Sequence, residues 1–407
     1  MKKSQKGMRY GTVFFILVTA VILTAIATYF YVSNMVSDLG RNQQIYSKLN
    51  KVNDLINKNY ILPIDPVYGN EQILDGIVEG YIDGLGDPYS YYLNETNYRI
   101  SSNAATSTGV GIGVLTTFDK ETGGVKVTFV KRNSPAESAG MESGDVITAV
   151  NGTPVTELGF RNAVYMLSGA EGSDVVVSFL RDGEVAPVTL TLTRMTYDSN
   201  TVEYRLLESG NGIGYISINE FAASTVSEFS AAVESLRDTG ARGFIIDVRF
   251  NAGGDFPSMR NVLDKVMPAG IMCSVKELAS ETTLPYYSSE GHLPEKIVVL
   301  QNFATSDVAE VFAAALRDAS GAVLVGDTSF GKGVGQRDIP LSDGSAIHIS
   351  TFAYVTPNGE EFNGVGISPD VAVALPEEKV LGFGTLAAAD DDQLQAAITQ
   401  MRTLLGG

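Results

Sequence analysis

Residues 212–248 read GIGYISINEFAASTVSEFSAAVESLRDTGARGFIIDV and decide the fold of the chain. The apolar segment Ile213–Ile218 predicts a strand. The segment Thr225–Glu228 has the spacing of a capping box, which predicts the start of a helix that ends at Gly240. Phe244–Val248 is apolar except for one aspartate, a pattern typical of a strand buried in a parallel sheet.

The same order of strand, helix and strand recurs further along the chain. Ile297–Leu300 and Ala322–Val325 are apolar strand candidates, and a helix is predicted to begin after Asp307. Its apolar face would consist of Val308, Val311, Phe312, Ala315 and Leu316. Successive βαβ units predict an α/β core with a parallel sheet.

Ahead of this core, residues 109–194 have a different pattern. Short alternating segments such as Val125–Val130 and Val175–Leu180 are separated by Gly, Asp and Asn turns, which predicts a compact, mostly β module. The module opens with GVGIGV, whose exposed backbone N–H groups could hold a terminal carboxylate. The candidate peptide-binding residues are Gly111, Ile112, Gly113 and Val114.

The composition excludes several classes of function. Lys and Arg number 29 against 47 Asp and Glu, for a formal net charge of −18, so the surface lacks the positive field that nucleic acid binding requires. Cys273 is the single cysteine, which excludes an intramolecular disulfide and a thiolate zinc cluster. His292 and His348 are too few for a multi-histidine metal site. We expect neither a metal nor another cofactor.

The amino terminus has the pattern of a membrane anchor. Four basic residues precede Gly11–Val32, a run without charge that would form a helix about 30 Å long. We expect a cytoplasmic tail over 1–10, a transmembrane helix over 11–33 and the rest of the chain outside the cytoplasm, as a single-pass protein of the cell membrane. A cleaved signal peptide ending near Ala25–Ala27 is the alternative.

A phosphate-binding loop is suggested by GDTSFGKG at 326–333, which supplies GxxxxGK after a strand. A nucleotide site needs Ser or Thr at the next position for Mg²⁺, and the residue there is Gly333. The sequence that follows does not have the pattern of a helix, so no helix dipole would face the phosphates. We therefore set nucleotide hydrolysis aside.

Several motifs in order resemble those of the C-terminal processing peptidases, the tail-specific proteases with a PDZ module and a Ser/Lys catalytic site. The stretches that carry the resemblance are GLGDPYSYYL at 84–93, SPAESAGMESGDVITAVNG at 134–152, GIGYISINEF at 212–221, FIIDVRFNAGG at 244–254, TSFGKGVGQ at 328–336 and TFAYVTPNGEEFNGVGISPDV at 351–371. The resemblance covers the chain from about residue 40 to its end.

The resemblance implies a set of catalytic roles. A serine attacks the peptide carbonyl, a lysine removes its proton, and a glutamine orients the lysine. Lys332 and Gln336 match the lysine and the glutamine, and Gly253 and Gly254 fall in the glycine-rich turn near the oxyanion.

The serine of the family pattern is replaced. Its place is three residues before a glutamate, which is Glu310 here, and Asp307 stands at that position. A lysine that acts as a general base has to be neutral, and a neighbouring carboxylate favours its charged form instead. A carboxylate is also a poor nucleophile toward an amide, because attack would give an anhydride that is more reactive than the amide.

Two other interpretations of this segment remain open. Asp307 and Glu310 have capping-box spacing, and an anion at a helix N-terminus is stabilised by about 0.3–1 kcal/mol, so the aspartate could serve the fold. Ser306 could act as a shifted nucleophile with Lys332 in an active endopeptidase, although a shift of one residue turns the side chain to a different direction.

Three further polar residues have ordinary structural explanations. Asp247 and Arg249 lie at the carboxyl end of a predicted parallel strand, where α/β proteins build their sites, but structural pairing is the commoner role. His348 lies in an alternating strand and is expected to be a packing or surface residue.

The expected architecture is a mixed α+β and α/β multidomain chain. Its predicted parts are the anchor, a helical segment over 40–98, a polar linker at 101–107, a PDZ-like module over 105–195, a βαβ peptidase core over 196–375 and a helical tail over 376–407. The expected partners are polypeptide C-termini or unstructured proteins and, through the anchor, a membrane. A homo-oligomer is left open.

Overall fold

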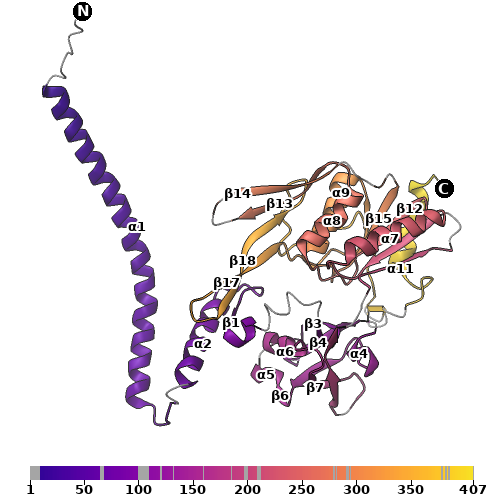
Figure 1. Ribbon diagram of the computed structural model, residues 1–407, viewed down its shortest axis with the longest axis horizontal. Helices are drawn as coiled ribbons and strands as arrows, with labels where there is room; N and C mark the ends of the chain where they lie inside the picture. The colour runs from indigo at the N-terminus through magenta and orange to yellow at the C-terminus, as the bar shows by residue number, and fades with distance from the viewer. Residues whose placement is uncertain are drawn as a thin grey trace, which may run out of the picture. The chain divides into compact units, whose positions relative to one another are not determined.

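The computed structural model describes residues 10–64, 68–99, 110–119, 122–131, 133–158, 160–184, 186–196, 200–208, 212–277, 280, 282–289, 293, 295–376, 379–380, 383 and 386–406 (Figure 1). The predicted linker 101–107 and His292 lie outside these residues. The chain divides into two compact units, one that ends at Leu74 and one that begins at Asp75.

The first unit contains the long helix α1, Tyr10–Asn59, and helix α2, Tyr68–Asp83, spans the boundary between the units. Among the residues that the structure describes, no helix combines the length and the apolarity needed to cross a bilayer. The transmembrane anchor predicted over 11–33 is therefore wrong.

The PDZ-like module is built on an antiparallel sheet in the order β3-β4-β5-β7-β8, with β6 paired to β5 and a separate pair β2-β9. The strands are β2 Val110–Gly111, β3 Val114–Phe118, β4 Val125–Val130, β5 Val146–Val150, β6 Thr153–Pro154, β7 Asp174–Leu180, β8 Val188–Thr193 and β9 Met195–Thr196. The helices are α4 Pro135–Ser138, α5 Val155–Leu158 and α6 Phe160–Leu167. Strand β3 lies at the sheet edge.

The core domain contains a six-stranded sheet in the order β10-β11-β12-β15-β16-β19. All its neighbouring pairs are parallel except β10-β11. The strands are β10 Val202–Leu206, β11 Ile213–Ile218, β12 Gly243–Asp247, β15 Lys296–Gln301, β16 Val323–Gly326 and β19 Val371–Ala372. The helices are α7 Thr225–Asp238, α8 Phe256–Val266, α9 Val308–Ser320 and α11 Asp392–Leu404.

Helices cover both faces of this sheet, which explains why Phe244, Ile245 and Ile246 of β12 are all apolar. Phe244 and Ile246 join the cluster under α7, α8 and α9, whereas Ile245 joins the cluster under α11 (Figure 1). All three side chains have no exposed surface. Alternate residues of a strand point to opposite faces, so a sheet covered on both sides needs apolar residues at every position. Helix α11 lies within the predicted tail 376–407 and packs on this sheet.

A second, antiparallel sheet has the order β1-β18-β13-β14, with β17 also paired to β18. Its strands are β1 Tyr91–Leu93, β13 Gly270–Glu277, β14 Thr282–Ser288, β17 Val334–Pro340 and β18 Ala346–Val355. The segment just before the PDZ-like module thus supplies an edge strand, β1, to the core domain (Figure 1).

One local prediction fails at helix α7. The helix begins at Thr225 as expected, but its N-cap residue, Ser224, makes no side-chain capping bond. Glu228 Oε2 instead accepts hydrogen bonds from Thr201 Oγ1 and Val202 N, both at 3.0 Å. The glutamate therefore ties the helix to β10, because a tertiary partner competes successfully with the local cap.

Candidate active site

Two loops at the carboxyl ends of neighbouring parallel strands bring Asp307 and Lys332 together. Asp307 ends the loop after β15 and directly precedes α9, and Lys332 lies in the loop after β16. Lys332 Nζ lies 2.5 Å from Asp307 Oδ2, and the two side chains are 22% and 17% exposed. The pair is thus accessible from solvent.

The backbone of Asp307 is strained. Its φ of 59° and ψ of −130° lie in a region that side-chain-bearing residues rarely adopt. Such conformations cost about 1–3 kcal/mol and concentrate at functional sites, where a sharp strand-to-helix turn presents a side chain. Burial raises the pKa of the Asp307 carboxyl above its usual value, while the charge of Lys332 opposes that rise.

The side chain of Glu310 hydrogen-bonds both loops. Its side chain has no exposed surface, and its Oε1 accepts hydrogen bonds from Ser329 Oγ at 2.5 Å and Gly331 N at 2.6 Å. Its Oε2 accepts from Lys332 N at 2.8 Å and Asp307 N at 3.0 Å. Burial raises the pKa of Glu310, and these hydrogen bonds oppose the rise. Glu310, for which the sequence predicts a role in a capping box, therefore fixes the spacing of Asp307 and Lys332.

The glycine-rich turn Asn251–Gly254 packs against Asp307. Gly253 has a φ of +104°, and a Cβ there would lie 2.7 Å from Asp307 Cβ, so only glycine fits. The turn is held by Ser306 N, which donates to Asn251 O at 3.0 Å, and by Phe221 N, which donates to Gly253 O at 2.9 Å. The N–H of Gly253 itself donates to Asn251 Oδ1 at 2.8 Å. An oxyanion role for Gly253 and Gly254 stays a prediction.

Gln336, the predicted orienting residue, has other hydrogen-bond partners. Gln336 Nε2 donates to Ser350 Oγ at 3.0 Å and to Val334 O at 3.3 Å. Within the described part of the chain, neither Gln336 nor the Ser306 hydroxyl hydrogen-bonds Lys332 Nζ. The structure thus joins Lys332 to Asp307, and not to Ser306.

Tyr89 is a neighbour of Lys332 to which sequence reasoning gave no role. Its ring centroid lies 5.4 Å from Lys332 Nζ. The stretch 84–93 was singled out only for its resemblance to the family pattern, and no periodicity could place it beside a loop that follows it by more than 200 residues. The contact depends on the tertiary structure.

The predicted carboxylate loop adopts a compact form. Gly113 has a φ of +82°, and a Cβ there would lie 2.1 Å from Ser134 Cβ. The carbonyl of Ile112 accepts a hydrogen bond from Ala136 N at 2.9 Å, and that of Gly113 accepts from Lys131 N at 2.9 Å. Gly111 ends β2 and Val114 begins β3, so the loop leads directly into the edge strand of the sheet.

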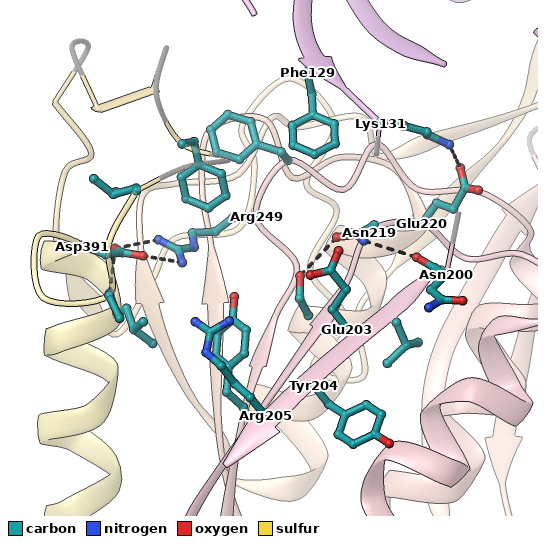
Figure 2. Close-up of a pocket in the computed structure, with 18 of the residues that line it drawn as sticks. Phe129, Lys131, Asn200, Glu203, Tyr204, Arg205, Asn219, Glu220, Arg249 and Asp391 are labelled. Carbon is teal, nitrogen blue, oxygen red and sulfur yellow. Dashed lines mark hydrogen bonds and ion pairs between the residues drawn. The ribbon is translucent and has the colours of Figure 1, made fainter. Parts of the chain in front are cut away.

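Asp247 and Arg249 form a buried network away from this site. Arg249 Nη2 lies 2.6 Å from Asp247 Oδ2 and 2.8 Å from Asp391 Oδ2, and its side chain is 1% exposed. Tyr215 donates to Asp247 Oδ2 at 2.7 Å. Arg249 and Asp391 lie at the wall of a cavity of about 620 Å³, and the bonds between them are drawn in Figure 2. Neither Asp307 nor Lys332 lines this cavity.

His348 contributes to packing. Its Nδ1 lies 2.5 Å from Asp338 Oδ1, and its ring stacks on Tyr91 with centroids 4.4 Å apart. The stacking joins β1 to β18, and the contact with Asp338 joins β17 to β18. Among the described residues, no group of three or more His, Cys, Asp or Glu side chains could hold a metal ion.

Comparison with known proteins shows the family of the chain. The model of peptidase family S41 matches residues 212–373, that of the PDZ domain matches 110–192, and that of the activating protease CtpB N-terminal domain matches 27–97. The carboxy-terminal processing protease CtpA of Bacillus subtilis (strain 168) is 31% identical over 382 residues, which cover 91% of this chain and 78% of that protein.

Two further relatives extend the comparison. The carboxy-terminal processing protease CtpB of Bacillus subtilis (strain 168) is 30% identical over 81% of this chain and 68% of its own length. The solved structure of a photosystem II D1 C-terminal processing protease has a TM-score of 0.61 and 28% identity, and covers 80% of this chain and 86% of that one. The chain therefore belongs to peptidase family S41, as a C-terminal processing peptidase with a PDZ domain.

Proposed function

We propose that this chain binds the carboxyl termini of polypeptides through its PDZ domain and hydrolyses them poorly or not at all, because Asp307 occupies the position of the nucleophilic serine. The observation that carries the proposal is the 2.5 Å contact between Lys332 Nζ and Asp307 Oδ2. In this arrangement the lysine faces a carboxylate instead of a hydroxyl.

The chemistry of the pair supports weak turnover. A lysine activates a serine by accepting its proton, which requires a neutral amine and a hydroxyl within hydrogen-bond reach. A carboxylate at this distance favours the ammonium by Coulomb attraction. Asp307 thus removes both requirements of the family mechanism, while Glu310 and Gly253 retain the geometry around it.

The PDZ domain supports peptide binding. A peptide can add as a further strand to an exposed sheet edge, where main-chain hydrogen bonds supply affinity. Strand β3 is such an edge, and it begins where the loop Gly111–Val114 ends. A peptide along β3 would therefore carry its terminal carboxylate to the N–H groups of that loop.

The test uses the full chain and an unstructured polypeptide with an apolar carboxyl terminus. We expect binding by calorimetry that is lost when the peptide is amidated at its C-terminus, and no cleavage products by mass spectrometry. Cleavage that disappears in Lys332→Ala would contradict the proposal, and cleavage lost in Ser306→Ala would identify Ser306 as the nucleophile. Absence of binding to the free-carboxylate peptide would contradict the binding part.

A further inference from the structure

The loop between α2 and β1 has a defined conformation. Tyr89 N donates to Asp87 Oδ1 at 3.0 Å, and Ser90 N donates to Asp87 O at 3.2 Å. Ser90 Oγ also donates to Asp87 Oδ2. The carboxylate of Asp87 therefore closes the loop on itself and fixes the direction of the Tyr89 backbone.

The same loop is anchored to the core domain. Ser90 is 2% exposed, and its Oγ accepts a hydrogen bond from Ser350 N, in β18, at 3.0 Å. Directly after it, Tyr91–Leu93 pairs with β18 in the register Tyr91↔His348. The loop is thus held against β18.

The attachment of this loop to β18 places the ring of Tyr89 beside the Lys332 ammonium. Tyr89 is half-buried, and its ring centroid lies 5.4 Å from Lys332 Nζ, within the roughly 6 Å over which a ring attracts a cation. Burial, with the negative charges of Glu310, Asp87 and Asp307, raises the pKa of the Tyr89 hydroxyl. The tyrosine is therefore a neutral phenol at neutral pH and offers its ring rather than a negative charge.

Gln336 is linked to the Asp87–Ser90 loop through β18. Its Nε2 donates to Ser350 Oγ at 3.0 Å, while the N–H of the same serine donates to Ser90 Oγ. Gln336 and the Asp87–Ser90 loop thus meet at Ser350. The direct neighbours of the Lys332 ammonium are the carboxylate of Asp307 and the ring of Tyr89.

We propose that Tyr89 is a positioning residue for Lys332: its ring holds the ammonium against Asp307. This deepens the function proposed above and rests on it, since the ring adds a second contact that keeps Lys332 at the carboxylate. The inference concerns the state of one amine, so it can be tested without any hydrolysis.

The test measures how fast Lys332 is acylated by acetic anhydride in the folded full chain, residue by residue, by mass spectrometry between pH 6 and 10. Only a neutral amine reacts. Tyr89→Leu removes the ring, and we expect Lys332 to react about twofold to tenfold faster near pH 8. Tyr89→Phe retains the ring and should stay within about twofold of the unaltered chain.

Lys276 is the internal control, because its ion pair with Glu361 lies on the surface, 2.6 Å between Nζ and Oε1, and should react equally in all three chains. An unchanged Lys332 in Tyr89→Leu overturns the proposal. Equal acceleration in Tyr89→Phe and Tyr89→Leu also overturns it, since the hydroxyl and not the ring would then be responsible. Peptide cleavage by the unaltered chain would contradict the proposed function without changing either result.

Discussion

Two ionic groups lie at the carboxyl ends of strands of the parallel sheet, and they differ in burial and in the number of carboxylates that they contain. Arg249 is 1% exposed and bonded to two carboxylates, whereas Lys332 is 22% exposed and bonded to one. Asp307 also has a strained backbone, with a φ of 59°. Burial with saturated hydrogen bonding thus distinguishes the Arg249 cluster from the partly exposed Asp307–Lys332 pair.

The comparison is tested most strongly by Asp307→Ser. If the rest of the machinery is intact, a hydroxyl in place of the carboxylate gives Lys332 a proton to accept, and general base catalysis is worth about 10²- to 10⁴-fold in rate. We expect the rate of cleavage of an unstructured polypeptide to rise by on the order of 10²-fold or more above that of the unaltered chain. Asp307→Ala is the matched control and should gain nothing. An Asp307→Ser chain that folds and binds peptide but cleaves no faster would show that the loss extends beyond one residue.

The buried Arg249 cluster is tested by Arg249→Ala. Removing the guanidinium leaves Asp247 and Asp391 buried without compensation, and breaking such a cluster costs about 3–5 kcal/mol. Urea unfolding of the full chain should report this loss, with peptide binding by the PDZ domain unchanged. Lys276→Ala is the control, because exposed ion pairs contribute only about 0–1 kcal/mol. Equal losses in the two variants would remove the distinction between buried and surface pairs.

A smaller effect is expected for Gly253→Ala. The new Cβ would lie 2.7 Å from Asp307 Cβ at a φ of +104°, and we expect a loss of about 1–3 kcal/mol in the free energy of unfolding. Gly359→Ala separates the cost of the positive φ from the cost of the clash, since Gly359 has a φ of +87° but no atom within 4 Å of the added Cβ. A loss no larger at Gly253 than at Gly359 would mean that the turn does not press on Asp307.

The last prediction concerns the reactivity of the Cys273 thiol, which lies in the buried core. Its side chain has no exposed surface, and burial raises the pKa of its thiol to about 12. Because the thiolate is the reactive form, the native chain should resist alkylation by iodoacetamide at pH 8 and react fully in urea. Rapid labelling of the folded chain would show that the core opens.

Sequence alone was enough for the elements whose periodicity is strong. The βαβ order, the apolar run of β12 and the PDZ module follow from patterns repeated over many residues, and the family follows from ordered motifs. Two predictions are wrong. The anchor over 11–33 was inferred from absent charge, and Glu228 was assigned to a local cap although it binds Val202 N.

The residue types of the site, Asp307 and Lys332, were determined by the sequence itself, since an alignment of motifs needs only order and spacing. Only the tertiary structure decided which of these residues are in contact. Glu310 hydrogen-bonds both loops, Gln336 hydrogen-bonds Ser350, and Tyr89 lies beside the Lys332 ammonium. These contacts join segments separated by tens to hundreds of residues, and local propensity carries no information on such distances. The loops of Asp307 and Lys332 meet because the neighbouring parallel strands β15 and β16 end at the same edge of the sheet.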